Sequence, residues 1–277
     1  MSFGKTIELF LVNGTADSLM TAELSNWNGK AIKIPRAEVQ KCQREDIKAV
    51  GVYFLFCQES NGTDSVYIGE AENVYDRLCQ HLRDFQSGKE IFYWNTAVIF
   101  IGRDLNKAHI RYLENKLYEE AKESGRYKLL TKNTYKNTVL KESQIASMDE
   151  FTENIRVLIS TLGYKVLVPM PKPTDDTVYL YCSGNGCKGK GFISAGGFTV
   201  VKGSLVSDHT TSSITVHGKG YYELRLQLEN EGIIEDRSFQ KDYEFSSPSA
   251  ASTVLLGRNS NGNIDWKTSE GISMKEL

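Results

Sequence analysis

The strongest constraint on the fold is an uninterrupted apolar segment that is followed by a turn and a second strand-forming segment. Residues 50–57 read Val-Gly-Val-Tyr-Phe-Leu-Phe-Cys, which has the length and composition of one buried strand. Asn61-Gly62 is a turn signal, and residues 65–69 can return beside the first segment. The sequence therefore predicts two antiparallel strands that are enclosed in a core.

Helix signals flank a third apolar strand at residues 96–101. The helix before it is expected to start after Asn73, a residue that suits a helix N-cap. The helix after it is expected over residues 107–124, where Gly125 ends it. A further amphipathic helix at residues 149–162 is expected to close this part of the chain. The predicted fold class is α+β.

The first 48 residues are rich in strand formers, and we expect a small β-hairpin module there. Residues 6–12 favour a strand, and Asn28-Gly29 is a turn signal between residues 24–27 and 31–34. Trp27 either packs against this hairpin or contacts a substrate.

A proline-rich segment divides the chain into two domains. Three of the five prolines fall within residues 166–176, where alternate prolines favour extended backbone. We therefore expect a domain at residues 49–168, a linker at 169–176 and a second domain at 177–277. The total of 277 residues allows each domain its own core.

Composition and charge exclude several classes of protein. The chain is 40% apolar and 25% charged with a net charge of −2, so a nucleic acid would have to be met by a local basic patch. No apolar run approaches a membrane span and no signal peptide is evident, so we expect a cytoplasmic protein. The five cysteines are predicted to be reduced. Cys182 and Cys187 suggest either half of a zinc knuckle or a glycine-rich turn between strands.

Two tyrosines, an arginine and a histidine stand at positions that can converge. Tyr53 and Tyr67 lie on the two paired strands, and Arg77 and His81 are one turn apart on the following helix. Two phenols with a nearby cation suit a site that cleaves a phosphodiester. Taken singly, each residue is more simply a half-buried strand tyrosine or a helix-surface side chain.

A carboxylate shares the apolar face of the second helix. Glu114 falls on one stripe with Ile110, Leu117 and Ala121. A buried carboxylate needs a partner, and either a divalent cation or Arg77 would serve. The structural alternative is an ion pair on a solvated helix face.

The order of these motifs resembles the GIY-YIG nuclease family over residues 49–168. The motifs are matched, in order, by Gly51-Val52-Tyr53, Tyr67-Ile68-Gly69, Arg77, His81 and Glu114. The resemblance implies an α/β domain with a central three-stranded antiparallel sheet. It also implies a hydrolase that cuts DNA with one divalent ion, Mg²⁺ or Mn²⁺.

The resemblance implies a role for each matched residue. One of the two tyrosines would position or deprotonate the attacking water, and the other would bind the phosphate. Gly69 would allow close approach of the backbone, and Arg77 would stabilise charge on the transferring phosphate. His81 would assist the base. Glu114 would be the lone protein ligand of the metal.

A basic segment follows the glutamate helix. The family places an asparagine here, and Asn133 is favoured over Asn137. Lys128, Lys132 and Lys136 are predicted to contact phosphates, with a solvated lysine-rich turn as the alternative.

The C-terminal residues resemble the uncharacterised DUF4357 domain and, more distantly, the RAMA domain of restriction and modification proteins. Expected elements are a strand at 198–204, a helix at 221–230, a helix capped by Ser247 and a closing hairpin over 256–267. The resemblance implies recognition of DNA, and modified bases are one class of target that it suggests. The candidate contacts are Ser204, Ser247, Ser249, Arg258, Asn261, Trp266 and Lys267.

These observations favour a metal-dependent DNA endonuclease in restriction, defence or mobile-element biology, with a C-terminal domain that targets DNA. Two alternatives stay open. The first is a nuclease-derived protein that binds nucleic acid without cutting it, and the second is a structure-selective repair nuclease.

Overall fold

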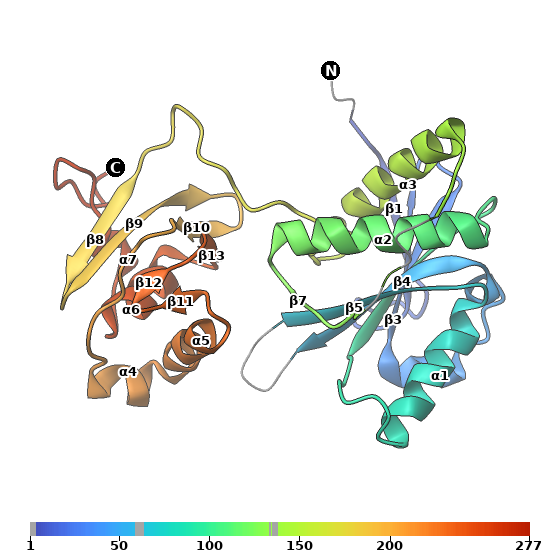
Figure 1. The fold of residues 1–277 in the computed structure, drawn as a ribbon, viewed down its shortest axis with the longest axis horizontal. Coiled ribbons are helices and arrows are strands. Elements are labelled where there is room, and N and C mark those ends of the chain that lie inside the picture. The colour runs from blue at the N-terminus through green and yellow to red at the C-terminus, as the bar shows by residue number, and fades with distance from the viewer. Residues whose placement is uncertain (1–3, 59–63, 133, 135–137) are drawn as a thin grey trace. The chain divides into compact units, whose positions relative to one another are not determined.

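The computed structural model describes residues 4–58, 64–132, 134 and 138–277. The chain divides into two compact units, Met1–Pro169 and Met170–Leu277, at the start of the proline-rich segment. Both units mix helices and strands, which confirms the α+β class (Figure 1). No helix among the described residues is long and apolar enough to cross a membrane.

The N-terminal unit is built on one seven-stranded sheet with the order β1-β2-β3-β6-β4-β5-β7. Its strands are β1 (Ile7–Leu11), β2 (Met20–Leu24), β3 (Gly29–Pro35), β4 (Gly51–Gln58), β5 (Asp64–Ala71), β6 (Thr96–Gly102) and β7 (Lys128–Leu129). The apolar segment forms β4, which pairs antiparallel with β5 as the sequence predicts. It also pairs antiparallel with β6 on its other side.

The sheet is wider than the three strands that the family resemblance implies. β3 pairs antiparallel with β6 along its whole length, from Gly29 opposite Gly102 to Pro35 opposite Thr96. The first three strands therefore extend the sheet formed by β4, β5 and β6, and their apolar side chains join its cores.

Helices cover both faces of this sheet (Figure 1). They are α1 (Val74–Gln86), α2 (Lys107–Ser124) and α3 (Glu142–Thr161), with short 3-10 helices at Arg36–Lys41 and Asp46–Lys48. Alternation along each strand sends side chains to opposite faces. Phe54 and Phe100 belong to the core under α2 and α3, whereas Tyr53, Leu55 and Ile99 belong to the core under α1.

Local capping fixes where two of these helices begin or end. Asn73 accepts a hydrogen bond from the backbone N–H of Asp76 at the start of α1, as expected. Gly125 ends α2 in the left-handed conformation that favours glycine. The third helix starts earlier than the sequence pattern indicates, at Glu142.

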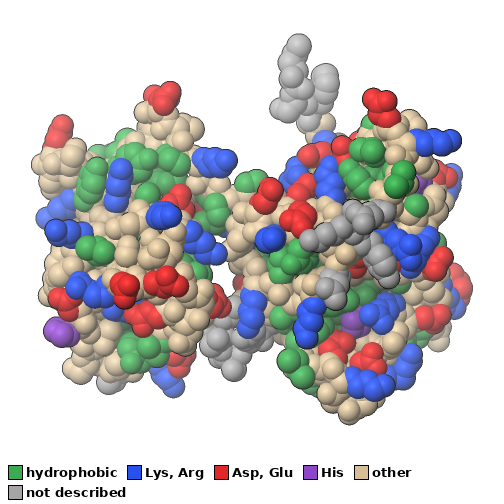
Figure 2. All heavy atoms as spheres, in the orientation of Figure 1, with side chains coloured by type: hydrophobic (Ala, Val, Ile, Leu, Met, Phe, Trp, Pro, Cys, Tyr) green, Lys and Arg blue, Asp and Glu red, His purple; other side chains and the backbone are tan. Residues whose placement is uncertain are grey.

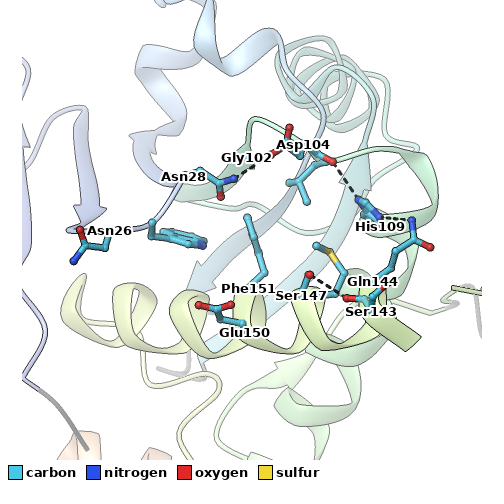
Figure 3. Close-up of a pocket in the computed structure, with 13 residues that line it drawn as sticks. Asn26, Asn28, Gly102, Asp104, His109, Ser143, Gln144, Ser147, Glu150 and Phe151 are labelled. Atoms are coloured by element: carbon cyan, nitrogen blue, oxygen red, sulfur yellow. Dashed lines mark hydrogen bonds between the residues drawn. The ribbon is translucent and has the colours of Figure 1, made fainter. Parts of the chain in front are cut away.

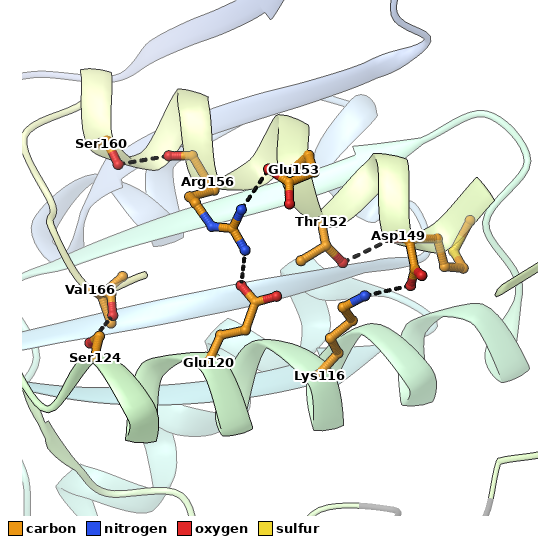
Figure 4. A network of polar contacts seen from close by, with 10 residues as sticks. Lys116, Glu120, Ser124, Asp149, Thr152, Glu153, Arg156, Ser160 and Val166 are labelled. Atoms are coloured by element: carbon orange, nitrogen blue, oxygen red, sulfur yellow. Dashed lines mark hydrogen bonds and ion pairs between the residues drawn. The ribbon is translucent and has the colours of Figure 1, made fainter. Parts of the chain in front are cut away.

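A polar network joins α2 to α3 (Figure 4). Lys116 Nζ lies 2.5 Å from Asp149 Oδ1, and Arg156 bridges Glu120 and Glu153 at 2.8 and 2.5 Å. Because these pairs are partly exposed, each contributes only about 0–1 kcal/mol, and they orient the helices more than they stabilise them.

The C-terminal unit combines a four-stranded sheet with four helices among its described residues. Its strands are β8 (Leu180–Gly184), β9 (Cys187–Ser194), β10 (Gly197–Val200), β11 (Ile234–Glu235), β12 (Ser238–Phe239) and β13 (Tyr243–Phe245). Its helices are α4 (Ser212–His217), α5 (Lys219–Asn230), α6 (Pro248–Leu256) and α7 (Gly262–Asp265). The larger sheet has the order β13-β10-β9-β8, and β11 pairs with β12.

Two sequence expectations about this unit have clear outcomes. Cys182 and Cys187 lie on the two strands of the β8–β9 hairpin, where Cys182 is opposite Gly189 and Cys187 is opposite Gly184. The Cys187 thiol donates to the Cys182 carbonyl at 3.6 Å. The prediction of a closing hairpin over residues 256–267 is wrong. Asn261 instead caps the short helix α7 by accepting a hydrogen bond from the Asn263 N–H. Gly262 lets this turn approach α6, since a Cβ there would clash with the backbone of Pro248.

Candidate active site

Four of the residues predicted from the sequence converge on the α1 face of the sheet. The rings of Tyr53 and Tyr67 have centroids 6.2 Å apart and an interplanar angle of 25°. The Tyr53 hydroxyl lies 2.9 Å from His81 Nε2 and accepts a hydrogen bond from Arg77 Nε at 3.3 Å. The Tyr67 ring meets the imidazole of His81 edge-on at 5.2 Å between centroids.

Gly69 makes room for this arrangement. It lies directly opposite Tyr53 on the neighbouring strand. A Cβ at residue 69 would stand 2.5 Å from the Tyr53 hydroxyl oxygen and 2.8 Å from Tyr67 Cε1. The glycine therefore makes room for the two phenols.

The hydrogen-bond donors form one consistent chain. A carboxylate can only accept, so His81 donates from Nδ1 to Glu90 Oε2, 2.6 Å away. With the Nδ1 proton donated to Glu90, Nε2 can accept a hydrogen bond from the Tyr53 hydroxyl group. The Tyr53 oxygen accepts a hydrogen bond from Arg77 Nε. Burial raises the pKa of Tyr53 well above its usual value, the nearby Tyr67 adds to this rise and Arg77 opposes it. Tyr53 is thus a neutral phenol.

Glu90 is a member of this site that sequence reasoning missed. It stands in the segment between α1 and β6, and its Oε1 is buried without a hydrogen-bond partner among the described residues. No spacing rule connects such a residue to His81, because the contact depends on how the segment folds back over the helix. Glu90 holds the imidazole in one orientation.

An open pocket of about 750 Å³ lies against the site. Tyr67, Arg77 and His81 line it, whereas Tyr53 is fully buried beneath them. Lys89, Lys128 and Lys132 also line the pocket. Several Lys and Arg side chains lie on the visible face of this unit (Figure 2). The acidic residues of the lining are Asp84 and Glu90. The pocket can therefore present cations to an anionic ligand.

The basic segment is described only in part. Lys128 lies in β7 and Lys132 follows it, and both line the pocket. Asn133 and Lys136, which the sequence analysis also selected, lie outside the described residues.

Glu114 lies on the buried face of α2, as its helical spacing predicts. Its side chain is 6% exposed, and its Oε2 has no hydrogen-bond partner among the described residues. Burial raises the pKa of Glu114 to about 7, and the neighbouring carboxylate of Glu70 adds to the rise. Lys107 and Arg77 oppose it. Lys107 is itself paired with Glu70 at 2.9 Å, so its charge is shared.

The raised pKa of Glu114 predicts a dependence of stability on pH. The carboxyl group stays protonated in the folded protein up to about pH 7, whereas its ordinary pKa is 4.5. The folded state therefore binds more protons in this window, and stability falls as pH rises through it. We expect Glu114→Gln to remove that slope. Without divalent metal, the variant should be more stable than the wild type by about 1–2 kcal/mol at pH 8, after allowance for solvent screening.

Urea unfolding in EDTA at pH 5 and pH 8 measures this effect. The variant and the wild type should differ less at pH 5, where both side chains are neutral. If the free energies of unfolding of the variant and the wild type differ equally at the two pH values, the raised pKa of Glu114 would be contradicted.

Most candidate residues of the C-terminal unit hold its fold together. Trp266 is fully buried and donates from Nε1 to the Pro248 carbonyl at 2.9 Å, so its ring is part of the core. Ser204 bonds the backbone of Lys190, Ser247 caps α6 and Ser249 accepts from Gly262 N–H. These positions are structural in the described conformation.

The other C-terminal candidates lie nearer the surface. Arg258 is half-exposed and pairs with Asp265 at 3.1 Å. The backbone of Lys267 bonds that of Tyr181. Of the two charged candidates, Lys267 is the more exposed, and Arg258 is the one whose side chain an ion pair holds in place.

Comparisons with known proteins identify only the C-terminal unit. Residues 180–277 match the family described as Domain of unknown function (DUF4357). This match confirms the resemblance of the C-terminal residues to DUF4357. The DUF4357 match covers the whole of the β8 to α7 region and does not extend to residues 1–179. No curated protein and no solved structure matches the chain.

Proposed function

We propose that the N-terminal unit is a metal-dependent endonuclease of the GIY-YIG type that hydrolyses phosphodiester bonds of DNA. The observation that carries the proposal is the chain from Arg77 through Tyr53 to His81, beneath a pocket whose lining includes several cations. A merely structural pair of tyrosines would not require an arginine, a histidine and a carboxylate in one bonded series.

Arg77 is the proposed phosphate-binding residue. Its Nε is held by Tyr53 and its Nη1 by Gln80 at 2.8 Å, so the guanidinium is fixed at the pocket wall. A fixed guanidinium can stabilise charge that develops on a phosphate without reorganisation during the reaction. Lys128 and Lys132 at the same pocket would hold the neighbouring phosphates of the strand.

The two tyrosines receive different roles in this proposal. Tyr67 lines the pocket and is the phenol that can reach the attacking water or the phosphate. Tyr53 is buried and cannot touch the substrate, so it orients Arg77 and His81. His81 links Glu90 to Tyr53, because its Nδ1 bonds the Glu90 carboxylate and its Nε2 bonds the Tyr53 hydroxyl.

Glu114 fits the single metal ligand that the family resemblance implies. Its buried, unpaired Oε2 and its raised pKa are the properties of a carboxylate that lacks a cation. No group of three or more His, Cys, Asp or Glu side chains that could hold a metal occurs among the described residues. A Mg²⁺ ion bound by one carboxylate keeps most of its waters, and it would stabilise charge on the leaving oxygen. Arg77 and Tyr67 would orient the phosphate toward this ion.

The C-terminal DUF4357 unit is proposed to direct the nuclease to DNA. Arg258 is the candidate contact there, because its guanidinium is half-exposed and the paired Asp265 fixes it. The proposal places this protein in restriction, defence or mobile-element biology.

Cleavage of supercoiled plasmid tests the proposed function. We expect purified protein to nick plasmid, unmodified or carrying modified bases, in Mg²⁺ and not in EDTA. Glu114→Gln should lower the rate by on the order of a hundredfold or more if its carboxylate holds the metal.

A gel-shift assay on the same DNA separates the rival functions. Binding without nicking by the wild type, on plain and modified DNA, would reject the enzyme in favour of a non-cleaving binding protein. Preference for flaps or junctions over linear duplex would favour a structure-selective repair nuclease.

A further inference from the structure

A second pocket of about 570 Å³ opens on the other face of the N-terminal sheet (Figure 3). It lies among the β2–β3 turn, the segment after β6 and the first half of α3. None of its lining residues belongs to the candidate active site. It therefore needs an explanation of its own.

Two aromatic rings form one wall of this pocket. Trp27 and Phe151 have centroids 4.7 Å apart and an interplanar angle of 59°. Gly29 and Gly102, which face each other across β3 and β6, make room for them. A Cβ at Gly102 would stand 2.8 Å from Phe151 Cε2, and one at Gly29 would clash with the Trp27 indole. The two rings contact each other and together give the pocket an aromatic wall.

The charged groups that line the pocket are acidic. They are Asp104 from the segment after β6 and Glu150 from α3, and no Lys or Arg lines the pocket. Asp104 Oδ2 accepts from Asn28 Nδ2 at 3.2 Å. Among the described residues, neither carboxylate forms an ion pair.

His109 also lines the pocket, and both of its ring nitrogens have protein partners. Its Nδ1 lies 3.2 Å from the Asp104 carbonyl, which can only accept, so Nδ1 carries the proton. Its Nε2 lies 3.2 Å from Gln144 Nε2, whose amide is oriented because Gln144 Oε1 accepts from the Lys141 N–H. The Gln144 amide therefore donates to Nε2.

We propose that this pocket binds a small alkylammonium cation, with its charge between Asp104 and Glu150 and its alkyl groups against Trp27 and Phe151. Aromatic faces attract such cations, and weakly hydrated alkylammonium groups gain most from this contact. Two carboxylates with no Lys or Arg in the lining disfavour an anion or a phosphate. The site also gives Trp27 a role beyond packing its hairpin.

Tryptophan fluorescence reports directly on this pocket. Trp94 and Trp266 are fully buried, so Trp27 is the partly exposed indole among the three tryptophans. Titration with choline at constant ionic strength should give a saturable change. The uncharged isostere of choline, in which a tert-butyl group replaces the trimethylammonium group, should bind at least about fivefold more weakly, the ratio expected for an ordinary cation–π contact.

Charge-removing variants locate the cation. Glu150→Gln changes an exposed side chain that the fold does not need, and Asp104→Asn keeps an oxygen that can accept from Asn28. Each should weaken choline binding by about threefold or more, as loss of one screened charge near a surface predicts. Glu123→Gln on α2 removes the same charge outside the pocket and should leave binding unchanged.

Three outcomes would overturn the proposal. They are the absence of a saturable fluorescence change, equal affinity for choline and its isostere, and wild-type affinity in the folded Glu150→Gln variant. The urea midpoint of each variant establishes that it is folded.

Discussion

Gly69→Ala is expected to abolish most DNA cleavage while leaving a folded protein. The added Cβ would stand 2.5 Å from the Tyr53 hydroxyl and 2.6 Å from Tyr53 Cζ. Tyr53 cannot move aside freely, because it is fully buried and bonded to His81 and Arg77. The phenol must shift and break these bonds, at a cost of about 1–3 kcal/mol in the free energy of unfolding.

The effect of Gly69→Ala on catalysis should exceed its effect on stability. If Arg77 leaves its position by about 1 Å, the nicking rate should fall by on the order of a hundredfold. Plasmid nicking and urea unfolding of the same preparation measure both quantities.

Gly4→Ala is the matched control, since a Cβ at residue 4 has no neighbour within 4 Å. It should leave nicking and the unfolding midpoint unchanged. A Gly69→Ala variant with wild-type nicking would show that the positions of the two phenols do not matter for cleavage.

Tyr53→Phe is expected to reduce cleavage by about a hundredfold, the lower end of the range for loss of a group in a proton-transfer network. The ring that fills the core is kept, but His81 Nε2 and Arg77 Nε lose their shared partner. Leaving these buried polar groups unpaired should lower the free energy of unfolding by about 1–3 kcal/mol. Because Tyr53 does not line the pocket, DNA affinity in a gel shift should change little.

Tyr164→Phe provides the comparison for Tyr53→Phe. Tyr164 stacks on Phe56 with centroids 3.7 Å apart in the core on the other face of the sheet. Removing its hydroxyl should leave nicking unchanged. Equal nicking by both phenylalanine variants would exclude Tyr53 from the mechanism.

Local signals in the sequence predicted the parts of the structure that depend on neighbours along the chain. The apolar run became β4, Asn73 capped α1, and Gly125 ended α2. Helical spacing also placed Glu114 on a buried face, because burial on a helix follows its period. The convergence of Tyr53, Arg77 and His81 followed from the same two periodicities.

Features that depend on distant contacts were missed. Nothing local indicates that β3 pairs with β6, so the widening of the sheet was not anticipated. Glu90 reaches His81 only because its segment folds back over α1. Trp266 was considered a ligand contact, yet its indole packs on Phe198 with centroids 4.3 Å apart. A sequence pattern identifies an aromatic residue, but the packing of the whole unit decides whether its ring is accessible.

Glu114, Arg77 and the two tyrosines are proposed to form one site that hydrolyses phosphodiesters. Hydrolysis of bis-para-nitrophenyl phosphate tests it most directly, because this substrate requires no recognition of a DNA sequence or modification. We predict release of para-nitrophenolate that depends on Mg²⁺ or Mn²⁺, with loss of on the order of a hundredfold in Glu114→Gln. A wild-type rate equal to that of buffer with metal, or equal to that of Glu114→Gln, would contradict the account.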